Sequence, residues 1–548
     1  MPKRRLFAIL IAALVLLVAA MFIVTYQPVR HARDDFRAGR TADAIVTANR
    51  WLSLRLWSRQ HRQLLAASYL TTGNRAAAQP HLDALRGERQ WISVVAKKDV
   101  ANRLFARGAF DDFLAYDAAV RDRDTDDVKL YRAAAQLAAD RVSEAEATMR
   151  TIDRDDVDAK KLASFDRALA ERRTGSYPLV VDRNGQTIAA YVIANRDVVA
   201  INTDFAPLVE KEAGGLTIES VLPRIGAGSR IETTLDPAMQ KAALAALGNF
   251  RSSLVAIDPR TNEILALASQ RGDGPIANLA LEQQYEPGSV LKILTGLAAR
   301  ENGVTLNFPY NCTGSLNVDG RTFNDWIAGG HGLLPSFDDA FARSCNVVFA
   351  DYGVHLGRDR LQTFFNKAGF ERQVDLGLMH APLGHKVGNV FNNFETAFYA
   401  IGLEHTSMTT LHLAMLATMM ANRGVLATPR LFTARRSILG ETIGEFAKPA
   451  GAQLVDRANA EAIVHAMSAV VTHPLGTGRR AAIDGLPIAM KTGTAGKRES
   501  GYQAVIVAFA PVDQPKIAFA LVAEESGPAE FAAAKIAHDF LTAIRSRL

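Results

Sequence analysis

The sequence predicts a multidomain protein: a membrane-spanning helix, then an all-α helical-repeat domain, then an α+β domain. Three observations predict this order, namely an uncharged apolar run at the start, a helical period near 34 residues, and a later alternation of strand-like and helical segments. The chain has 548 residues, of which 48% are hydrophobic and 22% charged, so a mostly disordered chain is excluded. Its net charge of +6 is small for this length and does not indicate nucleic-acid binding.

The apolar run extends from Leu6 to Val24 without a charge or a proline. At about 1.5 Å per residue it measures about 28 Å, close to the thickness of a bilayer core. We therefore predict a cytoplasmic stub and transmembrane anchor over residues 1–29. A cleaved signal peptide is the alternative, with a cleavage site at 18–20, but apolar sequence continues beyond it. Basic residues flank the run on both sides and leave its orientation open.

Residues 30–175 are predicted to form a helical domain of repeats. Four similar segments recur there: FRAGRTADA from Phe36, LTTGNRAAA from Leu70, FARGAFDDF from Phe105 and LAADRVSEA from Leu137. One shared position holds Gly39, Gly73, Gly108 and Asp140, at spacings of 34, 35 and 32. This period resembles the tetratricopeptide repeat, although an irregular helical bundle remains an alternative. Stacked repeats would offer a concave face, which predicts a protein partner.

The next residues, 176–228, are predicted to be a short β-rich linker, because apolar and polar residues alternate around the turn signal Asn184-Gly185. Residues 229–548 are predicted to form the α+β domain. It begins with a strand and a helix opened by Asp236-Pro237. Two strand-like runs, around residues 254–257 and 264–268, follow as a hairpin.

Three short motifs in this last domain carry chemistry. In the first, Ser289 and Lys292 are three residues apart on a predicted apolar helix, so they share a face. A serine is a weak nucleophile unless a base takes its proton, and a lysine is such a base when burial lowers its pKa. The second motif is Ser344-Cys345-Asn346. We prefer it to a second match at Ser315, because its flanks look helical.

The third motif is Lys491-Thr492-Gly493-Thr494, between two strand-like runs. Each of the first two motifs is common by chance, but the three in this order within the last 260 residues are specific. Together they resemble the active site of the penicillin-binding proteins, which are acyl-serine transferases. Further segments over 230–548 look like the family, including TTLDPAMQKAALAAL, AIDPRTNEILALAS and GGHGLLPSFDDAFARSCN. LVVDRNGQTIA in the linker also resembles class B members.

The resemblance implies a role for each matching residue. Ser289 is expected to be the nucleophile that attacks a peptidoglycan stem peptide, with Lys292 as its base. Ser344 is expected to relay a proton, while Asn346 holds the lysine and Lys491 sets the electrostatics. Thr492 and Thr494 are expected to bind the terminal carboxylate beside Gly493. The implied oxyanion hole consists of the backbone N–H groups of Ser289 and Thr494.

The resemblance thus predicts a membrane-anchored D,D-transpeptidase of the bacterial cytoplasmic membrane, with a single span and a periplasmic catalytic domain. β-Lactams are the expected inhibitors, and no metal or organic cofactor is implied. A D,D-carboxypeptidase, a β-lactamase-like hydrolase and a non-turnover sensor or scaffold are the alternatives. The sequence departs from the family at Met490, where glycine is frequent, and in its short linker.

Three other residues, His331, Cys312 and Cys345, are not assigned a catalytic role. His331 is interpreted as an ordinary loop histidine, and Cys345 as a packing residue whose side chain points away from its neighbours in the motif. The two cysteines, Cys312 and Cys345, are too few for a disulfide scaffold or a structural zinc site made of cysteines. A disulfide between them is an open alternative in an oxidising compartment.

Overall fold

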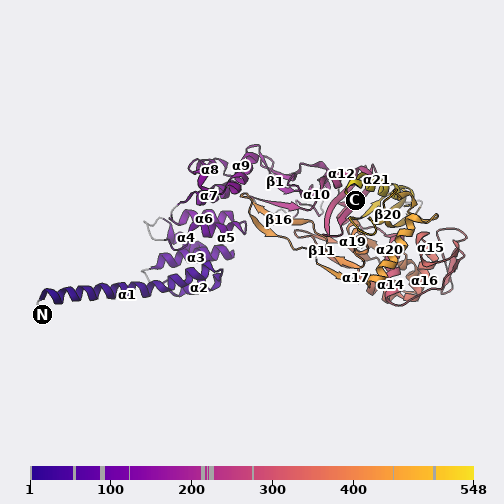
Figure 1. Cartoon of the computed structure of the whole chain (residues 1–548), viewed down its shortest axis with the longest axis horizontal. Helices are drawn as coiled ribbons and strands as arrows, with labels where there is room; N and C mark the ends of the chain where they lie inside the picture. The colour runs from indigo at the N-terminus through magenta and orange to yellow at the C-terminus, as the bar shows by residue number, and fades with distance from the viewer. Residues whose placement is uncertain are drawn as a thin grey trace. The chain divides into compact units, whose positions relative to one another are not determined.

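The structure is a computed structural model (Figure 1) that describes residues 3–53, 57–86, 93–122, 124–210, 216–218, 220, 228–273, 277–448, 450–497 and 501–548. The chain divides into two compact units. The first, which we call the helical unit, contains residues 1–177, 225–230 and 434–445. The second contains residues 178–224, 231–433 and 446–548, and we call it the catalytic unit because it holds all the residues that the sequence predicts to be catalytic.

The helical unit consists mainly of helices joined by short turns. They are α1 (Lys3–Arg37), α2 (Thr41–Arg50), α3 (Ser58–Thr72), α4 (Arg75–Leu85), α5 (Lys97–Phe105), α6 (Phe110–Ala119), α7 (Asp126–Ala138), α8 (Val142–Met149) and α9 (Ala159–Arg173). The predicted apolar run forms part of α1, and its residues from Ile9 onward are long and apolar enough to cross a membrane. The later part of α1 buries Val29, Ala32 and Phe36 in the core of the unit.

The four positions that the sequence aligned adopt the same backbone conformation. Gly39, Gly73, Gly108 and Asp140 have φ of 83°, 84°, 67° and 58°. Each ends one helix of a hairpin, and the next helix begins two residues later, at 41, 75, 110 and 142. A left-handed residue lets the chain turn back sharply, and glycine adopts it without a Cβ penalty. What recurs at this spacing is therefore the left-handed turn between two helices.

The core of the helical unit also contains residues from far along the sequence. Ile438, Leu439 and Ile443, near the tip of the hairpin of β16 (Phe432–Ser437) and β17 (Thr442–Glu445), belong to the same apolar cluster as the helices. Polar contacts accompany them, because Glu441 accepts a hydrogen bond from Tyr131 at 2.8 Å and pairs with Lys161 at 2.6 Å.

A six-stranded sheet has the order β17-β16-β4-β1-β2-β3. Its other strands are β1 (Ser176–Val181), β2 (Thr187–Val192), β3 (Asp197–Ala200) and β4 (Ser229–Thr233). The turn at Asn184-Gly185 joins β1 and β2, as the sequence predicted. The strands of residues 176–228 do not form a sheet of their own, because β1 also pairs with β4 in parallel.

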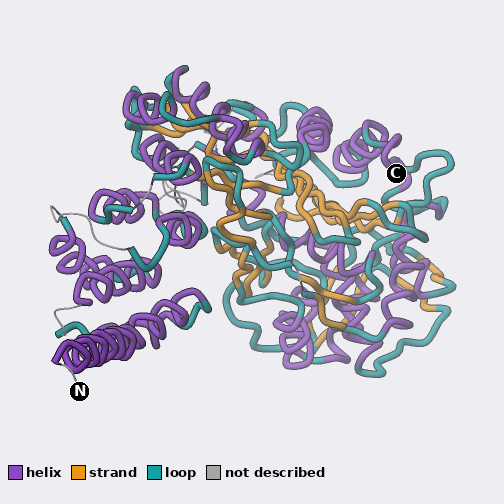
Figure 2. The backbone as a smooth tube through the Cα atoms, turned by 60° about the vertical axis from the view of Figure 1, so that its left-hand side comes forward, coloured by secondary structure: helices purple, strands orange, loops and turns teal. Residues whose placement is uncertain are grey.

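The catalytic unit is built on a five-stranded antiparallel sheet in the order β19-β20-β21-β5-β6. Its strands are β5 (Arg251–Asp258), β6 (Glu263–Arg271), β19 (Ala489–Lys497), β20 (Gly501–Ala510) and β21 (Ile517–Ala523). The central strand β21 is buried along its whole length, because helices cover both faces (Figure 2). Helices α12 (Pro237–Leu247) and α21 (Ala532–Ala543) pack on one another and on the sheet, while α19 (Thr410–Ala421) packs on β5, β20 and β21.

The remaining helices of this unit include α10 (Ala206–Val209), α13 (Leu279–Glu282), α14 (Lys292–Glu301), α15 (Phe337–Ala342), α16 (Asn346–Leu356), α17 (Arg358–Lys367), α18 (Asn393–Ala400) and α20 (Arg457–Thr472). Short strands between them are β7 (Tyr310–Cys312), β8 (Ser315–Val318), β9 (Arg321–Asn324), β10 (Gly332–Leu334), β11 (Gln373–Asp375), β12 (His380–Pro382), β13 (Gly384–Lys386), β14 (Thr406–Met408), β15 (Val425–Ala427) and β18 (Gly451–Gln453). This α+β arrangement places α20 and the turn Gly288–Leu291 against the edge strand β19, and α14 and α15 pack on α20.

Candidate active site

Ser289 lies on a single turn of 3₁₀ helix, Gly288–Leu291, which leads directly into α14 at Lys292. The sequence predicted one continuous helix from Ser289, and the structure differs only in this tighter first turn. Val290 and Leu291 are fully buried, so they fix the turn against the core. Ser289 remains half-buried while Lys292 has no exposed surface, which places a reachable hydroxyl above a buried amine.

The Lys292 ammonium is held by neutral oxygen atoms. Its Nζ donates to the Ser344 carbonyl at 2.7 Å, to Ser344 Oγ at 3.3 Å and to Asn346 Oδ1 at 2.6 Å. Burial lowers the pKa of Lys292 to about 8, and the nearby Asp325 and Cys345 only partly oppose this shift. A buried amine without a carboxylate in contact gives up its proton more readily, so Lys292 has the properties of a general base.

The second motif occupies a strained turn between α15 and α16 instead of a continuous helix. Ser344 has a φ of 56°, in the left-handed region that residues with a Cβ seldom adopt. Cys345 precedes α16 as its N-cap, and its Sγ accepts a hydrogen bond from the Val348 N–H at 3.5 Å. The turn directs both Ser344 and Asn346 to Lys292. In a continuous helix, side chains two residues apart point to different sides, so the two could not both face Lys292.

The third motif lies on the edge strand β19. Lys491 is fully buried, and its Nζ donates to Ser344 Oγ at 2.9 Å and to the Thr492 carbonyl at 2.8 Å. Burial, with a smaller effect from the neighbouring Lys292, lowers the pKa of Lys491 well below its usual value. The Ser344 hydroxyl therefore bridges the two lysines, and the first, second and third motifs meet as the sequence predicted.

Thr492 and Thr494 are two residues apart on β19, so they share one face of the strand. Thr492 Oγ1 lies 2.6 Å from Thr477 Oγ1, and Thr494 Oγ1 accepts a hydrogen bond from the Ala529 N–H at 3.0 Å. These contacts hold both hydroxyl groups in place. Thr477 was not predicted, because it lies fifteen residues before Thr492 in a turn that carries no motif.

Two glycines let the serine turn and β19 approach closely. A Cβ on Gly493 would lie 2.4 Å from the Pro287 carbonyl oxygen, and one on Gly288 would lie 2.7 Å from the Thr494 carbonyl oxygen. Such distances exclude any side chain at either position. The backbone of Ser289 is therefore brought next to that of Thr494, the pair from which the sequence predicted an oxyanion hole.

Behind the second motif, four ligand-type side chains converge. Atoms of Cys312, Asp325 and Cys345 lie within 4.8 Å of one another, and the two free thiols are 3.4 Å apart. The hydrogen bond from Cys345 lowers the pKa of Cys312 to about 6. His331 Nε2 lies 3.3 Å from Asp325 Oδ1, yet neither ring nitrogen makes a well-aligned hydrogen bond to a described residue.

The thiols of Cys312 and Cys345 and the Asp325 carboxylate are of types that can ligate Zn²⁺, and His331 approaches this group through Asp325. The sequence did not predict that Asp325 and His331 join the two cysteines. His331 is predicted to be an ordinary loop residue, whereas its side chain is only 1% exposed. The Cys345 side chain contacts Asp325 at 3.2 Å and also Cys312, so it does more than fill space.

Trp326 is a further residue at the site that sequence reasoning missed. Its indole Nε1 donates to the Ser344 carbonyl at 3.2 Å, the same oxygen that Lys292 contacts. Trp326 is 51% exposed, so it joins the buried Ser344 turn to the surface. The only signal in the sequence is that Asp325-Trp326 shortly precedes the Gly-Gly-His-Gly segment.

Comparison with known proteins assigns the family. Residues 252–544, more than half of the chain, match the model of the penicillin-binding protein transpeptidase domain. The chain belongs to this family. That range contains every residue of the three motifs, and it begins at the second residue of β5 in the five-stranded sheet.

Two curated relatives and one solved structure illustrate the similarity. Penicillin-binding protein PbpB of Mycolicibacterium smegmatis is 29% identical over 366 residues, 58% of this chain and 54% of that protein. Peptidoglycan D,D-transpeptidase PbpA of Mycobacterium tuberculosis is 28% identical over 338 residues, which are 54% of this chain and 67% of that protein. Penicillin-binding protein A of M. tuberculosis, solved as a ceftriaxone acyl-enzyme complex, has the same fold: the TM-score is 0.61 at 22% identity, covering 70% of this chain and 99% of that one.

Proposed function

We propose that this penicillin-binding protein is a membrane-anchored peptidoglycan D,D-transpeptidase that cross-links stem peptides through an acyl-enzyme on Ser289. One observation carries the proposal: a half-exposed serine stands one turn before a fully buried lysine that contacts only neutral oxygen atoms. The names of the relatives, several of which are peptidoglycan D,D-transpeptidases, support the choice of substrate.

In the first half of the reaction, Ser289 Oγ attacks the carbonyl carbon of the penultimate D-Ala, and Lys292 takes the hydroxyl proton. The negative charge that develops on the carbonyl oxygen is stabilised by the N–H groups of Ser289 and Thr494, a contribution worth about 3 kcal/mol for one such donor. The leaving amine of the terminal D-Ala then needs a proton. Ser344 supplies it, because its hydroxyl is bonded to both Lys292 and Lys491.

Substrate binding involves the face of β19 that carries Thr492 and Thr494. Both present their hydroxyl groups from this face, and Lys491 immediately precedes them on the strand. These groups bind the carboxylate of the terminal D-Ala, with the backbone at Gly493 close to the peptide. Asn346 holds Lys292 through its Oδ1 and leaves its amide N–H₂ to face the substrate.

In the second half, an amine of a neighbouring stem peptide attacks the acyl carbon, and the ester bond to Ser289 Oγ breaks as the new amide bond forms. Lys292 takes the proton of the amine and returns it to Ser289 Oγ, which restores the free enzyme. If water attacked in place of the amine, the same site would be a D,D-carboxypeptidase or a β-lactamase. If neither attacked, the protein would be a β-lactam sensor or scaffold. β-Lactams inhibit by acylating the same serine, and an acyl-enzyme of this kind exists for the similar fold described above.

The test uses the purified full chain in detergent, labelled with fluorescent penicillin and then supplied with a stem pentapeptide and an amine acceptor. We expect long-lived labelling and an amide product in the wild type and neither in Ser289→Ala. The matched control is Ser315→Ala, which removes the serine of the other Ser-x-Asn match on β8 and is expected to change nothing. Rapid loss of label into water would assign a hydrolase, and stable label without product would assign a sensor.

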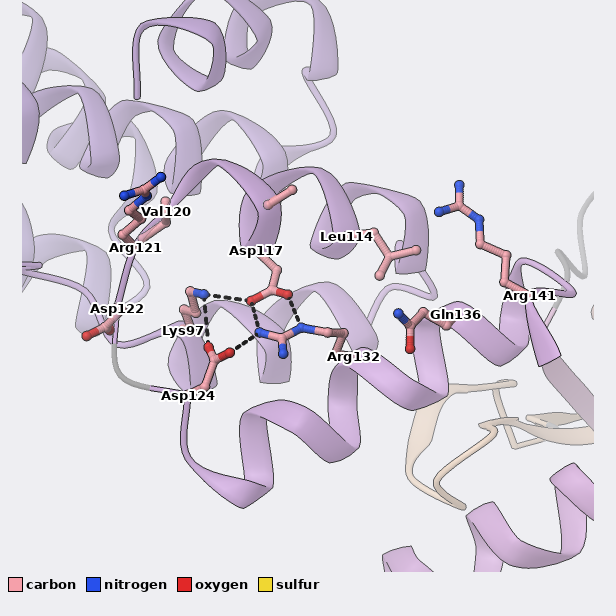
Figure 3. A pocket seen from close by; sticks show the side chains of 11 residues that line it. Lys97, Leu114, Asp117, Val120, Arg121, Asp122, Asp124, Arg132, Gln136 and Arg141 are labelled. Atoms are coloured by element: carbon pink, nitrogen blue, oxygen red, sulfur yellow. Dashed lines mark hydrogen bonds and ion pairs between the residues drawn. The ribbon is translucent and has the colours of Figure 1, made fainter. Parts of the chain in front are cut away.

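The proposal extends to the remainder of the chain. We infer that α1 is a single-pass anchor in the bacterial cytoplasmic membrane and that the catalytic unit lies outside the cytoplasm, where peptidoglycan is found. We also infer that the helices of the helical unit are tetratricopeptide-like and bind a protein partner. A polar cavity of about 510 Å³ beside α6 and α7 supports a binding role for this unit (Figure 3). Its lining combines basic residues, Lys97, Arg121, Arg132 and Arg141, with acidic ones, Asp117, Asp122 and Asp124.

A further inference from the structure

Trp57, just before α3, packs on α1 where the apolar run ends. Its ring lies 4.9 Å from that of Phe22 and 4.8 Å from that of Tyr26, measured between centroids. Its indole N–H donates to Thr25 Oγ1 at 3.2 Å. On the same turn, Ile23 and Phe22 are 63% and 48% exposed and face outward. Trp57 is therefore fixed at the level where the exposed apolar surface of α1 gives way to polar residues.

This level corresponds to a membrane interface, given the proposed anchor on which the inference rests. The nineteen residues from Leu6 to Val24 fill the hydrocarbon core, and the headgroup layer occupies about 5–7 Å beyond it. Tyrosine and tryptophan concentrate in that layer, because the ring is apolar and one end of it bonds to water. Tyr26 and Trp57 thus hold the start of α3 among the headgroups.

The same level carries positive charge. The short turn after α1 makes α2 an antiparallel neighbour, and ten residues of helix return about 15 Å, so Arg50 comes back beside the first turn past the apolar run. Arg30 lies one turn beyond Tyr26 on α1, and both arginines are exposed. In sequence, residues 25–33 and 49–64 contain no Asp or Glu, and their arginines are at 30, 33, 50, 55, 59 and 62. Arg33 pairs with Asp34 at 2.9 Å and is not counted in the patch.

We propose that this surface, the interfacial patch of Arg30, Arg50, Trp51 and Trp57, binds the headgroups of anionic phospholipids. Each arginine near a bilayer surface adds about 1 kcal/mol of attraction to anionic lipid. Beside Trp57 an apolar groove of about 220 Å³ receives the upper part of an acyl chain; it is lined by Phe22, Ile23, Tyr26, Trp57, Gln60 and Val94. The patch gives the helical unit a second attachment to the membrane besides the span itself.

The depth of Trp57 is the first test. The full chain, with Trp51, Trp91 and Trp326 changed to Phe, is reconstituted into phosphatidylcholine nanodiscs with bromine on the lipid chains. We expect bromine near the carbonyls to quench Trp57 strongly and bromine near the chain ends to quench it weakly. Quenching by aqueous acrylamide without quenching by either bromolipid would overturn the proposal. Release of the chain from membranes by an alkaline wash would show instead that the anchor itself is wrong.

The preference for anionic lipid is the second test. The full chain is equilibrated in mixed discs of phosphatidylcholine and phosphatidylglycerol, and the lipid retained after extraction is measured by mass spectrometry. We expect Arg30→Gln with Arg50→Gln to lower the enrichment of phosphatidylglycerol by about fivefold or more. The control, Arg150→Gln with Arg167→Gln, removes the same charge from exposed positions at the end of α8 and on α9 and leaves the enrichment unchanged. Equal enrichment in both pairs would overturn the proposal.

Discussion

Two buried lysines, one in each unit, show how differently the protein uses the same side chain. Lys97 in the helical unit is 4% exposed and lies between two carboxylates, 2.9 Å from Asp117 and 3.1 Å from Asp124. Arg132 pairs with both of these acids, so two cations face two anions (Figure 3). Lys292 in the catalytic unit has no exposed surface and contacts only neutral oxygens.

The difference is one of charge compensation. Removing a charge from water is costly, and Lys97 recovers that cost from its carboxylate partners, which makes the group a structural link between α5, α6 and α7. Lys292 has no such partner in contact, and its pKa falls to about 8. The catalytic unit therefore leaves a charge unbalanced where a base is needed, whereas the helical unit balances its charges.

The largest expected effect comes from removing the unbalanced lysine. We expect Lys292→Ala to slow acylation by fluorescent penicillin about a thousandfold, because a positioned general base typically contributes 10²–10⁴-fold. The fold should persist, since the substitution removes a buried charge. The second-order acylation rate and the circular dichroism spectrum measure the two quantities. A rate within tenfold of the wild type would show that Lys292 is not the base.

Removing Lys97, whose charge is balanced by carboxylates, should change the stability of the fold and not the rate of acylation. We expect Lys97→Met to lower the free energy of unfolding by about 3 kcal/mol, because Asp117 stays buried beside one cation where it had two. Acylation of the folded protein should stay unchanged. Calorimetry and the acylation rate measure the two effects. The control is Lys98→Met on the same helix. The Lys98 side chain is 49% exposed, so its loss should lower the free energy of unfolding much less.

Two glycines with positive φ sharpen the comparison between the units. We expect Gly288→Ala to slow acylation about a hundredfold, the usual effect of losing one oxyanion donor, because the new Cβ would press on Thr494 at 2.7 Å. Gly39→Ala in the helical unit introduces the same kind of backbone strain at a φ of 83°, but no atom lies within 4 Å of its Cβ. It should therefore cost about 1 kcal/mol of stability and leave acylation unchanged.

The smallest expected effect is a dependence on pH. Lys292 acts as a base only when neutral, so the acylation rate should rise as the pH increases through about 8. The neutral fraction grows by about tenfold between pH 7 and pH 9 for such a group, and the rate should follow it. Acylation rates across this range test the expectation. If the protein stays folded and the acylation rate does not change between pH 7 and pH 9, the pKa of the base lies outside this range.

Much of the candidate site was predictable because chemistry restricts the residue types that can perform it. The three-residue spacing of Ser289 and Lys292 puts both on one side of a helical turn whatever surrounds them. The other Ser-x-Asn match, at Ser315, lies on an exposed strand, whereas Ser344 lies in the turn between α15 and α16. Thr477, Asp325 and Trp326 were not predicted, because each reaches the site from a loop whose position depends on packing with distant residues.

The turn at Ser344 marks the limit of local reasoning. Apolar residues on both sides of Ser344 favoured a helix. The hydrogen bonds of Ser344 with Lys292 and Lys491 join residues far apart in the sequence, so local periodicity cannot predict them. The structure breaks the helix there and keeps a left-handed serine, since the hydrogen bonds to the two lysines offset its strain. The same holds for the hairpin tip near Glu441, whose packing against α7 and α9 spans some 280 to 310 residues.

The sequence by itself determined the anchor-like run, the helical hairpins with their left-handed turns, and the three motifs with their order. These depend on composition, periodicity and spacing, which act over a few residues. The tertiary structure alone decided which lysine is balanced by carboxylates and which is not, and which thiols meet a buried carboxylate. Charge compensation and desolvation depend on the neighbours that a folded chain brings together, so no local pattern encodes them.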